Sequence, residues 1–141
     1  TEAVKRPVDD PLPWMLADPR RLQRTPRDGM WLRLIDVASA LELRNYMQAG
    51  RLVLEVRDEM CPWNARRFVL EESPEGATCF ASESSPDLVL DVSALASTYL
   101  GAVSFSTLSH ASLVDERTPG ALSRADRMFA VQRQPWTPSG F

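Results

Sequence analysis

Apolar and polar residues alternate in several short runs along the middle of the chain. A period of two is typical of β-strands that bury one face. The run in which Leu52, Leu54 and Val56 alternate with polar residues is one example. Ser73-Pro74-Glu75-Gly76 separates two later runs and predicts a hairpin turn. The pattern predicts about five strands, over residues 30–36, 52–58, 66–72, 77–82 and 88–92.

Apolar residues spaced three and four apart predict helices between and after these strands. Asp36, Ser106 and Thr118 precede three of the helices and are suitable N-cap residues. The expected helices cover residues 37–48, 93–101, 107–113 and 119–130. Short links between consecutive strands favour antiparallel pairing. The order of elements therefore predicts an α+β fold, in which a mostly antiparallel sheet of about five strands is covered by helices on one face.

The first 28 residues differ in composition from the rest of the chain. Five prolines interrupt regular structure there, and only short helices over 11–16 and 18–23 are expected. Trp14 and its apolar neighbours are too hydrophobic for a free linker, so we expect them to pack on a neighbouring surface. We therefore divide the chain into a proline-rich connector (1–28) that packs on the domain, an α+β domain (29–131) and a C-terminal tail (132–141).

The tail holds the most informative residues of the chain. Pro135 and Pro138 restrict the backbone on either side of Trp136, whose indole has a large apolar area. A stiff tail that ends in Phe141 can place one free α-carboxylate at a chosen point. The alternative is an arm that simply docks on its own domain.

Three tryptophans, Trp14, Trp63 and Trp136, fall outside the expected core pattern. They can line a cavity or face another domain. The alternative is packing beneath long loops, which is about as common.

Composition and charge exclude several classes of function. A net charge of −3 is too weak to steer nucleic acid, and no apolar window is long enough to span a membrane. His110 is the single histidine, and Cys61 and Cys79 have no metal-ligand spacing, so we expect no metal site. Reduced thiols are the default in a cytoplasmic protein, the location we expect. A first residue other than Met is compatible with a piece of a longer protein.

Several stretches, taken together and in order, resemble the C-terminal domain of the Eis-type (enhanced intracellular survival) acetyltransferases. The similarity covers nearly the whole chain, and the ordered set is more specific than any one motif. The matching stretches are residues 7–12, 16–20, 29–37 and 50–56, Cys61-Pro62-Trp63-Asn64, Pro86-Asp87-Leu88, Tyr99-Leu100-Gly101-Ala102 and the terminal Phe141.

The resemblance implies a fold like sterol carrier protein 2 and a parent enzyme with two GNAT (GCN5-related) domains upstream. Acetyl-CoA would bind the first GNAT domain, so this fragment would hold no cofactor and would be inactive alone. The parent is expected to be a homo-oligomer. This domain would supply part of the amine-substrate pocket, and the Phe141 carboxylate would act as catalytic base or substrate anchor. Family members often have an acidic residue where this chain has Gly140.

The resemblance also makes Trp136, Trp14 and Trp63 candidates for the substrate pocket or a domain interface. Two other classes of function stay open at this point. One is a free-standing sterol-carrier-like module that binds lipid, and the other is a structural oligomerisation domain.

Overall fold

The computed structural model describes residues 4–138 and divides the chain into two compact units. The larger unit, residues 32–131, contains the sheet and its helices. In the smaller unit the connector extends to Trp31, three residues beyond its predicted end, and is joined by the tail from Gln132.

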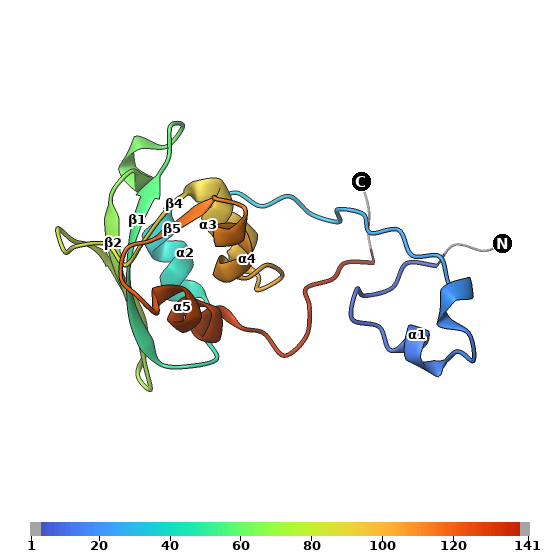
Figure 1. Ribbon diagram of the computed structural model, residues 1–141. Helices are drawn as coiled ribbons and strands as arrows, with labels where there is room; N and C mark the ends of the chain where they lie inside the picture. The colour runs from blue at the N-terminus through green and yellow to red at the C-terminus, as the bar shows by residue number, and fades with distance from the viewer. Residues whose placement is uncertain (1–3, 139–141) are drawn as a thin grey trace. The chain divides into compact units, whose positions relative to one another are not determined.

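A five-stranded sheet forms the centre of the larger unit (Figure 1). Its strands are β1 (Gly50–Arg57), β2 (Arg67–Ser73), β3 (Gly76–Ala81), β4 (Leu88–Asp91) and β5 (Val114–Glu116), in the spatial order β3-β2-β1-β4-β5. Neighbouring strands are antiparallel except for β1 and β4, which run parallel. The prediction of a mostly antiparallel α+β sheet is confirmed, with one parallel pair at its centre.

Helices cover one face of this sheet, as predicted (Figure 1). They are α2 (Val37–Leu43), α3 (Val92–Tyr99), α4 (Phe105–His110) and α5 (Ala121–Phe129). The alternating residues Leu52 and Leu54 of β1 are fully buried in the same core as Leu95 of α3 and Phe105 of α4. Burying each such side chain contributes about 1.5–3 kcal/mol, so the sheet and the helices stabilise one another.

The prediction of a strand over residues 30–36 is wrong. This segment has no regular secondary structure and pairs with no strand, and Met30 is mostly exposed while Leu34 is buried. Alternation alone cannot distinguish a strand from an extended segment that lies outside a sheet. The fifth strand is instead β5, which pairs with β4 and is too short to show an alternating pattern.

Helix α2 begins where it was predicted but ends early. The Asp36 carboxylate accepts a hydrogen bond from the Ser39 amide at 3.0 Å, which confirms the expected N-cap. The helix stops at Leu43 rather than Gln48, because Arg44 has extended backbone angles.

The caps of the two last helices differ from the prediction. Ser104, rather than Ser106, caps α4, and the Ser106 hydroxyl instead donates to the Asp126 carboxylate. Helix α5 begins after Gly120, whose φ of +84° lies in the left-handed region, and not at Thr118.

The guanidinium of Arg44 joins the ends of two helices. Its Nε donates to the Tyr99 carbonyl at 2.7 Å, and its Nη2 donates to the Phe129 carbonyl at 2.6 Å; these are the last residues of α3 and α5. Its Nη1 donates to the Asn45 carbonyl, and the Arg44 guanidinium lies over the rings of Tyr46 and Phe129. Terminal carbonyls lack partners within their own helix and carry partial negative charge, so a cation here stabilises both ends.

The smaller unit contains α1 (Leu12–Met15) and the 3₁₀ helix η1 (Pro19–Arg21), both shorter than predicted. The Asp18 carboxylate accepts from the Arg20 amide at 3.1 Å and caps η1, as expected. No described residue in 4–31 or 132–138 is buried. The apolar side chains of this unit are therefore at least partly exposed.

Candidate functional site

A buried carboxylate organises the loop between β1 and β2. Asp58 Oδ1 accepts hydrogen bonds from Arg33 Nη2 at 2.6 Å and from the amides of Met60 and Cys61, and its Oδ2 accepts from Asn64 Nδ2 at 3.0 Å. Burial by itself would raise the pKa of Asp58. The four hydrogen bonds outweigh burial and lower this pKa to about 2. The carboxylate is therefore ionised at neutral pH and fully partnered.

Asn64 extends the same network to the segment that leads into α2. Its Oδ1 accepts from the Val37 amide at 3.1 Å, and its Nδ2 also donates to the Ile35 carbonyl at 3.1 Å. Because Asn64 is itself buried, these bonds are shielded from water. Asp58 and Asn64 thus hold the β1–β2 loop against residues 33–37, the segment that leads into α2.

Trp63 lies in the 3₁₀ helix η2 (Pro62–Asn64) of that loop. Its Nε1 donates to the Ile35 carbonyl at 2.8 Å. About half of its surface, 53%, remains exposed. The N–H group therefore orients the ring, and part of the ring remains open to solvent.

The tail and the connector are held together within the smaller unit. The Gln134 amide donates to Asp9 Oδ2 at 3.2 Å, although the two residues are 125 positions apart. At Gly29, an added Cβ would lie only 2.6 Å from Thr137 Cγ2. The absence of a side chain at Gly29 is what allows the tail to approach the connector this closely.

The predicted site residues lie in different parts of the fold. Trp14, on α1, is 89% exposed and Trp136, in the tail, is partly exposed; both belong to the smaller unit, whereas Trp63 belongs to the larger one. Trp31, which the alternating pattern placed on a strand, is also strongly exposed. Phe141 lies outside the described residues. The roles of these residues in a pocket or an interface stay predictions.

Cys61 joins the Asp58 network, because its Sγ accepts a hydrogen bond from Arg33 Nη2 at 3.5 Å. Cys61 and Cys79 are free and buried. Burial raises the pKa of Cys79 to about 12, which keeps the thiol protonated and unreactive. Within residues 4–138, no group of three or more His, Cys, Asp and Glu side chains could hold a metal ion, and no helix could cross a membrane.

Comparison with known proteins assigns the fold to a family. Residues 37–138, most of the chain, match the sterol carrier protein domain. The chain belongs to the sterol carrier protein domain family. The predicted resemblance in fold is confirmed.

The relatives of this sterol carrier protein domain also confirm the resemblance to the Eis-type acetyltransferases. An uncharacterized N-acetyltransferase of Streptomyces avermitilis is 42% identical over 99% of the chain and 34% of its own length. The N-acetyltransferase Eis of Mycobacterium tuberculosis is 38% identical over 86% of the chain and 30% of its own length. The crystal structure of Eis1 from Mycobacterium abscessus superposes with a TM-score of 0.83 at 40% identity, covering 96% of this chain and 34% of that one.

This sterol carrier protein domain therefore spans about a third of the length of the curated relatives it matches.

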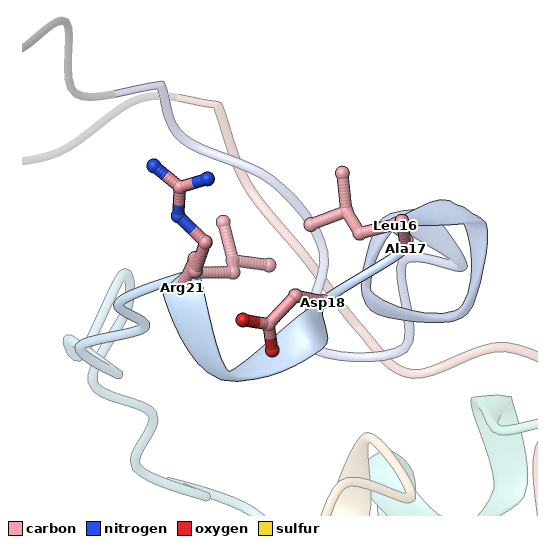
Figure 2. A pocket seen from close by; sticks show the side chains of 5 residues that line it. Leu16, Ala17, Asp18 and Arg21 are labelled. Atoms are coloured by element: carbon pink, nitrogen blue, oxygen red, sulfur yellow. The ribbon is translucent and has the colours of Figure 1, made fainter.

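A surface hollow of about 370 Å³ occurs in the smaller unit (Figure 2). It is lined by Leu16, Ala17, Asp18, Arg21 and Leu22, which are neighbours along one stretch of the connector. It is a local feature of the connector and not a lipid tunnel between the sheet and its helices.

We expect Gly29→Ala to release the tail from the connector. The new methyl group would overlap Thr137 Cγ2, and overpacking of this kind costs about 1–3 kcal/mol. The Gln134 amide, bonded to Asp9 in the wild type, should then exchange its hydrogen about tenfold faster or more, as measured by NMR. Gly29→Ala combined with Thr137→Ser, which removes the clashing methyl and keeps the hydroxyl, should restore slow exchange. Unchanged exchange in the single variant would contradict the close approach.

Sequence reasoning missed the residues that hold the β1–β2 loop and the tail in place. The pair Asp58 and Asn64, which flanks Cys61-Pro62-Trp63, is the one signal that could have indicated the loop network, because a carboxylate and an amide beside a strand end often bond loop amides. Nothing in the sequence indicates that Asp9 meets Gln134 or that Gly29 meets Thr137. These contacts depend on how the chain folds back on itself.

Proposed function

We propose that the chain is the C-terminal accessory domain of an acetyl-CoA-dependent N-acetyltransferase that acts on amine substrates. One observation carries the proposal: proteins named N-acetyltransferases match almost all of this chain, yet the chain accounts for only about a third of their length. The remaining length is sufficient for the upstream GNAT domains that the resemblance implies.

Acetyl-CoA belongs, in this proposal, to the upstream GNAT domains. Helix N-termini bind the phosphates of such ligands through free amides and positive partial charge. In the described domain, Asp36 and Asp91 are the N-cap residues of α2 and α3. The Glu116 carboxylate accepts a hydrogen bond from the Leu122 amide at the start of α5. Carboxylates at these positions repel phosphate, which supports the placement of the coenzyme site outside residues 32–131.

The Phe141 carboxylate would hold and orient the protonated amine substrate. An α-carboxylate has a pKa of about 3.5 in water and is a weak base at neutral pH. Desolvation between apolar walls raises this pKa, whereas a nearby ammonium lowers it. The carboxylate would therefore act mainly as an anchor that takes the amine proton directly or through water. The hydrogen bond between Gln134 and Asp9 and the close approach of Thr137 to Gly29 support a defined path for the tail.

The three tryptophans would serve the same assembly. Trp136 would fix the path of the tail, and Trp14 and Trp63 would meet the substrate pocket or the neighbouring domains. Their exposed apolar surface supports this role, because aromatic residues are enriched where proteins bind partners. The assembled parent would be a homo-oligomer.

The proposal is tested by comparing the 141-residue chain with the polypeptide from the complete reading frame. We expect the complete polypeptide to release CoA thiol from acetyl-CoA in the presence of primary amines. The 141-residue chain should show neither transfer nor calorimetric binding of acetyl-CoA. Micromolar binding to the short chain, or no transfer by the long one, would refute the proposal. Lipid carried by the purified chain in native mass spectrometry would instead favour a lipid-binding module.

A further inference from the structure

We propose that Ile35, Met60 and Trp63 form a preformed docking surface, the Trp63 patch, for the acetyltransferase portion of the same polypeptide. The inference rests on the proposed function and deepens it by naming where that portion binds. It concerns residues of the larger unit only.

Hydrogen bonds bring the three residues of the patch together. Trp63 Nε1 donates to the Ile35 carbonyl at 2.8 Å, which places the indole beside the backbone of Ile35. The Met60 amide donates to Asp58 Oδ1 at 3.1 Å, and Asp58 also accepts from Asn64, the residue after Trp63. Ile35 therefore lies in the same region as the loop that carries Met60 and Trp63, 25 and 28 positions later in the chain.

The three side chains of the patch are apolar and exposed to solvent. The side chains of Ile35 and Met60 are 59% and 74% exposed, and about half of Trp63 is exposed. The one polar group of the indole is already bonded to the protein, as is the Met60 amide. Single exposed apolar residues are common, whereas several exposed apolar residues in one region are typical of a binding surface.

The support beneath the patch is rigid. The buried carboxylate of Asp58 accepts four hydrogen bonds, and the buried Asn64 side chain donates two and accepts one. A surface that is fixed before binding loses little conformational entropy when a partner arrives. Tryptophan and methionine are also enriched at the centre of protein interfaces. The patch thus has both the composition and the rigidity of an interface centre.

The size of the patch favours a tethered partner over a second copy of the chain. Free partners generally bury about 800 Å² each, far more than three side chains offer, whereas domains of one chain associate through smaller, more variable contacts. Tethering raises the effective concentration of the partner to the millimolar range. The relatives supply such a partner, since about two thirds of their length lies outside the matched region.

Hydroxyl-radical footprinting with mass spectrometry tests the inference, because oxidation of methionine follows its exposure. Met60 should be oxidised about tenfold more slowly in the complete polypeptide than in the 141-residue chain. Met47, which is 53% exposed and lies outside the patch, is the internal control and should react equally in both. Trp63→Ala should return Met60 to the fast rate in the complete polypeptide. Leu113→Ala, at a residue as exposed as Trp63, should not.

The outcomes separate this inference from the proposed function. Equal oxidation of Met60 in both proteins, with acetyl transfer intact, would overturn the patch alone. Protection of Met60 without acetyl transfer would support the patch and count against the function alone. Protection that appears in the 141-residue chain and rises with its concentration would assign the patch to a second copy and overturn the inference.

Discussion

Deletion of Phe141 from the complete polypeptide is expected to lower kcat by about 10²-fold or more, as for loss of a positioned acid–base group. The carboxylate would lie beside the substrate ammonium, where water is largely excluded and the charge pair is weakly screened. Appending a few residues after Phe141, which displaces the carboxylate while keeping the ring, should have a similar effect. Steady-state kinetics on both variants measure the loss.

The matched control is Phe141→Leu, which keeps the chain length and the terminal carboxylate and should retain most of the turnover. Melting curves should show an unchanged Tm in all three variants, because the buried core of the domain lies within residues 34–129. Near-normal turnover in the deletion and the extension, with the fold intact, would rule out a catalytic tail. The tail would then be an arm that docks on the connector.

Arg44→Met is expected to destabilise the domain by about 2–4 kcal/mol, because hydrogen bonds to a charged group contribute about 1.5–3 kcal/mol each. The substitution removes the donors to the last carbonyls of α3 and α5 and the cation above the Phe129 ring. Urea unfolding should show a lower midpoint at an unchanged m-value.

Arg51→Met provides the comparison at an exposed site. Arg51 pairs with Glu71 at 2.9 Å, and both side chains are about half exposed. Surface ion pairs of this kind contribute about 0–1 kcal/mol, so the loss should stay within that range. Equal effects of the two substitutions would show that Arg44 does not join the helix ends in solution.

Most of the sheet could be predicted from the sequence. Apolar and polar residues alternate along its central strands, because one face of these strands packs on a single core. Strands β1 to β4 lie close to their predicted positions, and the hairpin turn before Gly76 is where it was expected. The misassigned strand at residues 30–36 and the missed strand β5 share one cause. Whether an extended segment joins a sheet depends on which edge is free, and the edge beside β4 is occupied by Val114–Glu116.

The candidate site was harder to predict than the fold. Composition singled out Trp14, Trp63 and Trp136, and the structure leaves each of them exposed, but exposure alone does not assign a role. The contacts that define the site join residues far apart in the chain, such as Asp9 with Gln134 and Arg33 with Asp58. The local pattern of apolar and polar residues carries no information on which distant residues meet.

The single parallel pair at the centre of the sheet has a consequence for how the chain folds. Strands β1, β2 and β3 can assemble early as a local antiparallel meander, because loop closure between them is short. The other edge of β1 stays unpaired until β4 reaches it, and β4 in turn waits for β5. An open, apolar strand edge promotes association with other chains. During synthesis, the interval between the appearance of Arg57 and that of Glu116 is therefore the period in which this domain is most prone to aggregate.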